Sequence, residues 1–209
     1  MTTTRSFGDI AFSDSVRAVQ TRRGSRAMFA RREAAGASRT EITPDLAAFI
    51  AEVDTAYLAT ASAAGQPYAQ HRGGPRGFLR VLDKHTIGFA DYAGNRQYIT
   101  LGNLSENSKA FLFLMDYVNG RRVKVWGTAR VVEGDAALQK QLGDPAYPGR
   151  VERAILFTVA AWDVNCQQHI HQRWSRRQIA PVIEQLQARI TELESQIERL
   201  NAKDRMANS

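Results

Sequence analysis

Apolar and polar positions follow two different periods along the chain. In residues 13–36 and 43–53, apolar side chains recur at the spacing of a helix, and Gly24 interrupts the first of these runs. Thr43 followed by Pro44 is typical of a helix start, because the hydroxyl caps free amides and proline suits the first helical position. We therefore expect helical segments before the first strand.

From residue 55 onward the period becomes that of β-strands. The expected strands occupy two segments within 55–72, joined by a turn at 64–67, and then segments 77–83, 86–91, 110–117, 121–133 and 154–165. A short helix with a loop is expected within 94–110, and a helix followed by a loop within 135–153. Gly127 indicates a bulge or a close approach. About six antiparallel strands at this spacing predict a mainly β fold, a small closed barrel with peripheral helices.

The C-terminal segment carries a heptad pattern. Its apolar positions are Ile179, Ile183, Leu186, Ile190, Leu193, Ile197 and Leu200. If Ile183 is position a, every a is isoleucine and the later d positions are leucine, which favours a parallel two-stranded coiled coil. Arg189 at g and Glu194 at the following e can pair between chains. The alternative is an amphipathic helix packed on its own domain, which needs a wider apolar face.

Length and charge indicate how the chain is divided into domains. The 209 residues suit one domain with appendages, and the net charge is +7. We expect a basic helical N-terminal arm over 1–40, a central domain over 41–174 and a C-terminal helix over 178–205. The arm holds eight arginines against three carboxylates. We recognise no base-stacking platform of aromatic residues in the arm, so we expect a solvated basic arm and no nucleic-acid partner.

Several classes of protein are disfavoured. No apolar run has the length of a membrane span, and no signal peptide is recognised, so we expect a cytoplasmic protein without a membrane partner. The single cysteine, Cys166, excludes an internal disulfide framework, and we expect it to act as a small hydrophobe. His169 and His171 are a weak metal signal, and surface histidines are the alternative, so no metal is expected. Hydrolase, P-loop and dinucleotide-binding motifs are absent.

The segments HRGGPRGFLR at 71–80 and GNRQY at 94–98 concentrate cations beside small residues. Arg72, Arg80 and Arg96 carry guanidinium groups, which bind phosphate through charge-assisted hydrogen bonds. A helix starting near Asn95 would add its amides, and glycines 73, 74 and 77 would let backbone amides approach a planar group. The other interpretation is a basic, glycine-rich hairpin end. The residues alone leave both open.

Three short motifs follow one another in a distinctive order. They are A-T-x-x-x-x-G-x-P from residue 59, G-N-R at 94–96 and V-x-G-x-A at 125–129. In this order and spacing, about residues 40–165 resemble the flavin-binding core of the pyridoxamine 5′-phosphate oxidase-like family. The segments HRGGP, GNRQY and WDVNC resemble an uncharacterised branch of it.

The resemblance implies a six-stranded Greek-key split barrel that forms a homodimer and binds FMN in grooves at the subunit interface. Residues 41–174 would then be the flavin-binding domain. The cofactor-binding residues that it implies are Arg72, Phe78, Leu79, Arg80, Phe89, Ala90, Asn95, Arg96, Gln97, Arg122, Trp162 and Asn165. Glutamine 97 stands where the family's phosphate-binding turn has lysine. No catalytic residue is implied.

The chain departs from the family near its end. The oxidase proper has an R-L-H-D-R-type segment that binds the vitamin phosphate, and this chain has WDVNCQQHIHQRW there. We therefore expect an FMN-dependent oxidoreductase acting on another small molecule or on a nicotinamide donor. The alternatives are a non-catalytic flavin or haem binder, with His71, His169 or His171 near the haem, and a deazaflavin-dependent reductase on the same fold.

Overall fold

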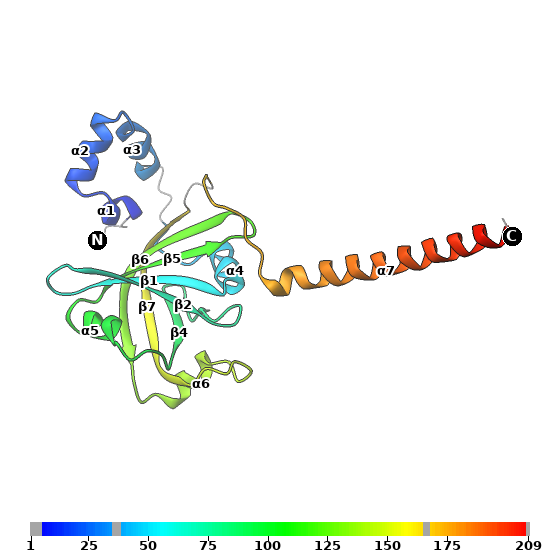
Figure 1. Ribbon diagram of the computed structural model, residues 1–209. Helices are drawn as coiled ribbons and strands as arrows, with labels where there is room; N and C mark the ends of the chain where they lie inside the picture. The colour runs from blue at the N-terminus through cyan, green and yellow to red at the C-terminus, as the bar shows by residue number, and fades with distance from the viewer. Residues whose placement is uncertain (1–5, 35–38, 165–167, 208–209) are drawn as a thin grey trace. The chain divides into compact units, whose positions relative to one another are not determined.

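The computed structural model describes residues 6–34, 39–164 and 168–207 (Figure 1). The chain divides into two compact units, Met1–Asp116 with Gly120–His169 and Tyr117–Asn119 with Ile170–Ser209. The first unit holds the sheet and helices α1 to α6, and the second holds helix α7. Two residues named above, Asn165 and Cys166, lie outside the described residues.

The strands form one antiparallel sheet. They are β1 (Thr55–Ala61), β2 (Pro67–Gly73), β3 (Arg80–Val81), β4 (Thr86–Tyr92), β5 (Lys109–Asp116), β6 (Arg121–Val132) and β7 (Val151–Val164). Their spatial order is β2-β1-β5-β6-β7-β4-β3. Strands β5, β6 and β7 are consecutive neighbours and β4 returns beside β7, which is a Greek key. The predicted mainly β split barrel is therefore confirmed, with seven described strands in place of about six.

Two strands differ from the predicted bounds. The segment predicted over 77–83 pairs with β4 only at Arg80 and Val81, and β7 begins at Val151, before the predicted start. The bulge at Gly127 is confirmed, because the register of β6 against β7 shifts there. A Cβ atom on Gly127 would lie 1.9 Å from the carbonyl oxygen of Thr158. Only glycine permits this approach of the two backbones.

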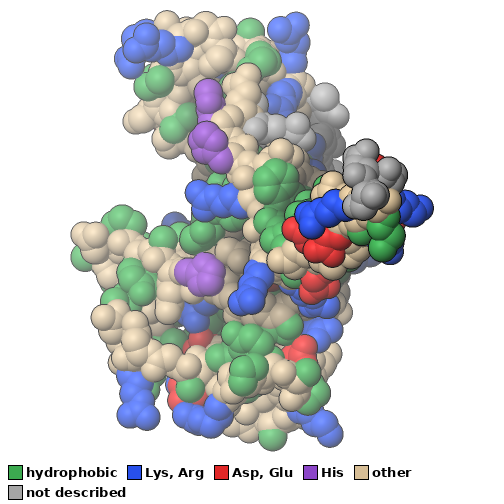
Figure 2. Space-filling view, turned by 45° about the vertical axis from the view of Figure 1, so that its right-hand side comes forward, with side chains coloured by type: hydrophobic (Ala, Val, Ile, Leu, Met, Phe, Trp, Pro, Cys, Tyr) green, Lys and Arg blue, Asp and Glu red, His purple; other side chains and the backbone are tan. Residues whose placement is uncertain are grey.

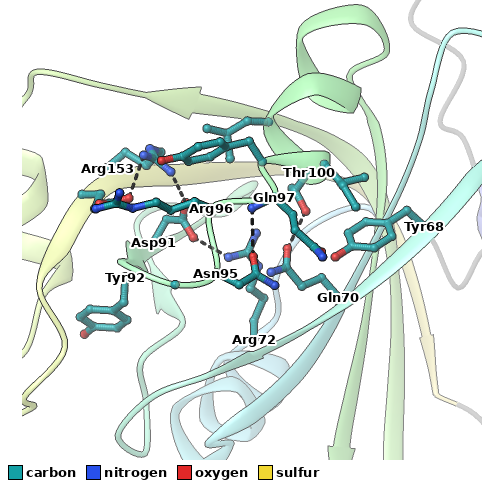
Figure 3. A pocket seen from close by; sticks show the side chains of 15 residues that line it. Tyr68, Gln70, Arg72, Asp91, Tyr92, Asn95, Arg96, Gln97, Thr100 and Arg153 are labelled. Atoms are coloured by element: carbon teal, nitrogen blue, oxygen red, sulfur yellow. Dashed lines mark hydrogen bonds and ion pairs between the residues drawn. The ribbon is translucent and has the colours of Figure 1, made fainter.

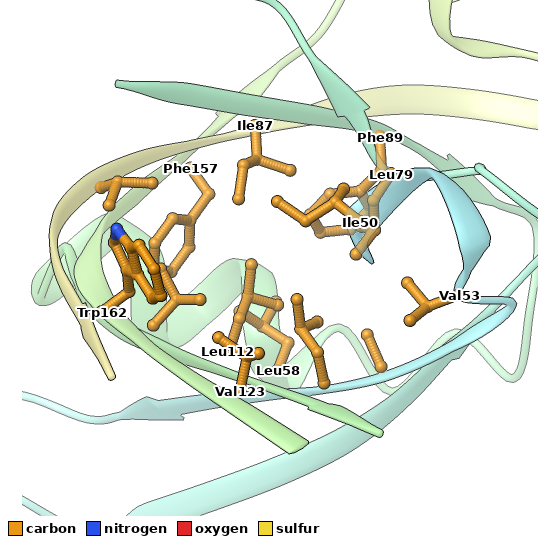
Figure 4. Packing of buried hydrophobic residues seen from close by; sticks show 14 of the residues in the cluster. Ile50, Val53, Leu58, Leu79, Ile87, Phe89, Leu112, Val123, Phe157 and Trp162 are labelled. Carbon is orange, nitrogen blue, oxygen red and sulfur yellow. The ribbon is translucent and has the colours of Figure 1, made fainter. Parts of the chain in front are cut away.

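The barrel interior is filled by aliphatic and aromatic side chains (Figure 4). Inward-facing residues alternate along β1, as period-two burial requires. Helix α4 (Pro44–Glu52) buries Leu46, Phe49 and Ile50 in the same cluster. The Thr43 hydroxyl accepts a hydrogen bond from the Leu46 amide at 3.3 Å, which confirms the predicted cap. Full burial stabilises by about 1.5–3 kcal/mol per large aliphatic side chain.

Helices α5 (Ile99–Glu106) and α6 (Ala136–Leu142) lie between strands in the sequence. The start of α5 differs from the predicted start near Asn95. Arg96 and Tyr98 have φ angles of 60° and 53°, in the left-handed region, so the helix cannot begin before Ile99. The side-chain amide of Asn103 in α5 donates to the Thr60 hydroxyl of β1 at 3.0 Å, and this bond holds the helix against the barrel.

The described part of the N-terminal arm contains three helices, α1 (Phe7–Ala11), α2 (Asp14–Arg22) and α3 (Arg26–Ala34). The single helix predicted over 13–36 is wrong, because Gly24 adopts a φ of 77° and ends the first of two shorter helices. Phe7 is buried and its ring stacks on Trp126 of β6 at 6.3 Å. The arm therefore packs on the barrel.

Several arginines of the arm are paired rather than freely solvated. Arg17 and Arg26 both bind Glu33, the first at 3.3 Å. Arg39 binds the buried carboxylate of Asp163 at 2.7 Å. The expected solvated basic surface is therefore only part of the arm, since these cations hold it together and tie its end to β7.

The second unit consists of the β5–β6 turn, a linker and helix α7 (Arg176–Ala207). The linker is tied to the turn, because the Gln172 side chain donates to the Val118 carbonyl at 3.0 Å and the Arg173 guanidinium lies 5.0 Å from the centre of the Tyr117 ring. Within the described parts of the chain, no helix has both the length and the apolar character needed to span a bilayer.

Candidate functional site

A pocket of about 170 Å³ lies where β2, the end of β4, the 93–98 loop, the first turn of α5 and the start of β7 meet (Figure 3). Its lining is mostly polar. It comprises Tyr68, Gln70, Arg72, Asp91, Tyr92, Gly94, Asn95, Arg96, Gln97, Tyr98, Ile99, Thr100, Leu101, Glu152 and Arg153. We call it the arginine pocket, after its three arginines.

Asp91 organises two of these arginines. Its carboxylate is nearly fully buried at the end of β4. One oxygen accepts a short hydrogen bond from Arg72 of β2, and the other accepts from Arg153 of β7 at 3.1 Å (Figure 3). A buried charge needs such partners to offset its desolvation. The network therefore fixes both guanidinium groups at the pocket.

Arg153 has further partners at the rim. It donates to Glu152 at 2.9 Å, forms an ion pair with Glu133 at 3.3 Å, and lies over the Tyr98 ring at 5.4 Å. Burial lowers the pKa of Arg153, but the hydrogen bond and charge of Asp91, with the two glutamates, outweigh it and raise the pKa above its ordinary value. Burial also raises the pKa of Tyr92 above its ordinary value.

Arg72 retains an unused donor. Its side chain is only 12% exposed, and its Nε atom is buried without a hydrogen-bond partner among the described residues. Arg96 lies in the loop, is exposed, and forms no ion pair with the described part of the chain. The pocket holds three arginines against Asp91 and Glu152, so one positive charge is in excess.

The loop before α5 presents backbone amides to the same pocket. The amides of a helix's first turn have no intrahelical acceptor, and the N-cap residue Tyr98 supplies no capping side chain. The Asn95 side chain accepts from the Gln97 amide at 3.1 Å and shapes the loop. The Thr100 hydroxyl donates to Gln70 of β2 at 2.7 Å, which holds the helix start against the sheet. Cations and amide dipoles therefore converge, and an anion is the ligand that they suit.

The structure brings four of the predicted residues together in the arginine pocket, namely Arg72, Asn95, Arg96 and Gln97. Phe78, Leu79 and Phe89 are instead buried in the barrel core, and Ala90 lies in a second buried cluster. Trp162 is also buried and donates from its indole to the Glu41 carbonyl at 2.8 Å. Arg80 lies exposed on β3, and Arg122 lies on β6 with a buried Nε atom lacking a hydrogen-bond partner; neither lines this pocket.

In the glycine-rich segment 71–80, two of the backbone amides that were expected to be free for a ligand are already used. The Gly74 amide donates to the Asp54 carbonyl at 3.3 Å, and the Gly77 amide donates to the Val53 carbonyl at 3.0 Å. These two donors are therefore used by the fold.

Sequence reasoning missed Asp91, Arg153, Thr100 and Tyr98 as parts of the site. In the sequence, Asp91 follows an apolar run and Arg153 comes just before another, positions where a charged residue has no distinctive pattern. Only the pairing of β4 with β7, which sets Asp91 opposite Arg153, brings the two together. The change from polar loop to buried strand at 151–154 was the one available signal.

A histidine-based metal site is not supported. All four histidines are exposed, and Figure 2 shows histidine side chains at the surface of the face that it draws. Across the described ranges, no three His, Cys, Asp or Glu side chains gather in a way that could hold a metal ion. The ring of His71 packs edge-on against Tyr57, 5.8 Å between centroids.

The fold is a split barrel, and it carries a polar pocket lined by three arginines. The chain matches the pyridoxamine 5′-phosphate oxidase family over residues 42–165, more than half of its length, and it belongs to that family. No curated protein matches it.

Solved structures show weaker similarity. HupZ from Group A Streptococcus is 20% identical, with 64% of this chain and 99% of that chain covered and a TM-score of 0.49. An FMN-binding protein from Syntrophomonas wolfei is 14% identical, with coverages of 71% and 97% and a TM-score of 0.46. HutZ, a haem storage protein from Vibrio cholerae, is 16% identical, with coverages of 59% and 93% and a TM-score of 0.40.

Proposed function

We propose that this protein is an FMN-binding oxidoreductase that holds the cofactor phosphate in the arginine pocket. The observation that carries the proposal is the convergence of Arg72, Arg96 and Arg153 with the uncapped first turn of α5. Guanidinium groups and helix N-terminal amides are the donors that proteins use for phosphate. Membership of the pyridoxamine 5′-phosphate oxidase family supports a flavin as the source of that phosphate.

The residues present fit this group. The unpartnered Nε of Arg72 is a buried donor that a phosphate oxygen would satisfy. Arg96 brings a cation that forms no ion pair with the described residues and is free to turn toward the ligand. Arg153 would act at longer range, because its two terminal nitrogens donate to Asp91 and Glu152 and its Nε lies 3.3 Å from the carboxylate of Glu133.

The size of the pocket bears on the assembly. Its volume of about 170 Å³ is below the roughly 300–1,000 Å³ usual for a whole ligand site. It suits a phosphate with part of its chain, so the flavin ring would lie outside it. A second copy of the chain would complete such a site, which supports the homodimer that the family resemblance implies.

The reaction is proposed only by class. Bound FMN would supply hydride-transfer chemistry, and the chain would supply position and charge. The phenol of Tyr92 and the carboxylates of Asp91 and Glu152 border the phosphate end, where they would orient donors. We assign no catalytic side chain, and the substrate is proposed to be a small molecule or a nicotinamide donor.

The experiment is a titration of the apo-protein with FMN, followed by flavin fluorescence, for wild type and Arg96→Ala. Losing a charge-assisted contact to phosphate should weaken binding about ten- to a hundred-fold. Arg76→Ala is the matched control, because Arg76 is exposed and pairs with Glu52 away from the pocket. Equal affinity of Arg96→Ala and wild type would contradict the assignment.

The absorption spectrum of the purified protein tests the cofactor class. FMN gives two flavin absorption bands. Haem gives a Soret band, and a deazaflavin gives a single band at a wavelength between the two bands of FMN. Either of the latter spectra would replace the FMN proposal with the corresponding alternative. Reduction of the flavin by NADH, NADPH or candidate small molecules then tests for turnover.

A further inference from the structure

Helix α7 carries an apolar stripe that nothing in its own unit covers. The stripe consists of Ile179, Ile183, Leu186, Ile190, Leu193, Ile197 and Leu200, and all seven side chains are exposed, from 37% at Ile179 to 61% at Leu200. A stripe of this length exposed to water is a binding surface rather than a chance surface residue.

The spacing of the stripe identifies the kind of partner. Its steps alternate between four and three residues, a period of 3.5 that keeps a seam facing another helix only if the two supercoil left-handed. The outward heptad positions b, c and f between residues 184 and 202 are Glu, Gln, Ala, Thr, Glu, Ser, Glu, Arg and Ala. The apolar face is therefore too narrow for packing on a domain surface, which needs a wider one.

The residues within the seam select the number and direction of the helices. Each a position from Ile183 onward is isoleucine and each d position from Leu186 onward is leucine, the combination that favours two parallel strands. Because the partner must present the same seam, the simplest occupant is a second copy of this helix.

Charge complementarity points the same way. In a parallel pair, Arg189 at g faces Glu194 at the following e of the other chain, twice by symmetry. An antiparallel pair sets g beside g and e beside e, and cannot bring these two residues together. In the single chain, Arg189 donates to Glu192 of its own helix at 2.6 Å. In the paired helices, Glu194 of the other chain would compete with Glu192 for this guanidinium group.

We propose that α7 pairs with α7 of a second copy as a parallel, in-register, two-stranded coiled coil from Ile179 to Leu200. The seam stops there, because the next a position is Asp204. Three heptads are marginal as a free peptide, but a dimer formed elsewhere in the chain would hold the helices at high effective concentration.

Cysteine cross-linking of the full chain tests the geometry. In a Cys166→Ser background, Leu200→Cys places two thiols side by side only if the helices are parallel and in register. Ala202→Cys, on the outward face of the same turn, is the matched control. We expect rapid disulfide dimer formation at 200 and little at 202. Equal cross-linking at both sites, or none at 200, would overturn the proposal, as would preferred cross-linking of Leu200→Cys to Ile183→Cys in a mixture.

Charge exchange gives a second test that does not depend on cysteine. Arg189→Glu should lower the melting temperature, and adding Glu194→Arg should restore it, because the pair is re-formed between chains. Glu192→Gln removes the pair within the helix and controls for its contribution. A double variant no more stable than the single one would contradict the interchain pair. No readout involves flavin, so a failure here is distinct from a failure of the proposed function.

Discussion

Arg72 and Arg153 donate to opposite oxygens of one carboxylate, that of Asp91, although their strands β2 and β7 are not neighbours in the sheet. The carboxylate therefore links three strands at the place where the arginine pocket opens. This arrangement satisfies a buried charge and positions the two cations at the same time.

Replacing Asp91 by asparagine should destabilise the protein and weaken anion binding together. An amide cannot balance two buried guanidinium groups, so breaking the network should lower the free energy of unfolding by about 3–5 kcal/mol. Chemical denaturation measures this change. Glu52→Gln, which breaks the exposed pair with Arg76, should cost less than about 1 kcal/mol. Similar losses in the two variants would mean that Asp91 has no special role.

Replacing Gly127 by alanine should be strongly destabilising. The added methyl would lie 1.9 Å from the Thr158 carbonyl, so β6 and β7 must separate, at a cost of about 1–3 kcal/mol or more. Gly102→Ala is the control, since nothing lies within 4 Å of its Cβ and it is inside α5; it should gain about 0.5–1 kcal/mol. Thermal unfolding compares them, and a tolerated Gly127→Ala would refute the close approach.

Asp83 should contribute to stability in a pH-dependent way. The amide of His85, which donates to its carboxylate at 2.7 Å, is the main cause that lowers the pKa of Asp83 from 3.8. Because folding lowers this pKa, the stabilisation from Asp83 is fully present at a pH above the pKa of the unfolded state. It is lost as the pH falls through the pKa of the folded state. Asp83→Asn keeps an acceptor without titrating, so its stability should fall less steeply in acid. Chemical denaturation at a series of pH values measures this, and an equal loss of stability in acid for wild type and Asp83→Asn would contradict it.

Removing residues 176–209 should distinguish the proposed coiled coil of α7 from the proposed dimer contact at the flavin site. We expect a lower melting temperature and retained FMN binding, because the arginine pocket lies entirely within the first unit. Sedimentation with absorbance detection measures mass and bound flavin together. An unchanged melting temperature would show that α7 does not stabilise the assembly, and a monomer that binds FMN tightly would contradict a site completed by a second copy.

Local signals predicted most of the strands and the start of α4, but not every helix boundary and not the site. Thr43 and Pro44 specify the start of α4 because capping depends only on neighbours in the sequence. The start of α5 was misplaced because Arg96 and Tyr98 adopt left-handed backbone conformations, which neither residue type favours. Asp91 could not be assigned a role from its neighbours, since its partners lie 19 and 62 residues away.

The distances along the sequence between Asp91 and its two partners also set the order in which the parts of the pocket form during folding. During synthesis from the N-terminus, β2 and β4 are available long before the segment that carries Arg153, so Asp91 must wait for its second partner. The complete pocket, with the β7 residues that line it, therefore forms only in a nearly complete barrel, and a phosphate ligand that binds this pocket would stabilise that end state. Supplying flavin to cells should raise the amount of protein that survives, while leaving the rate at which new chains fold unchanged.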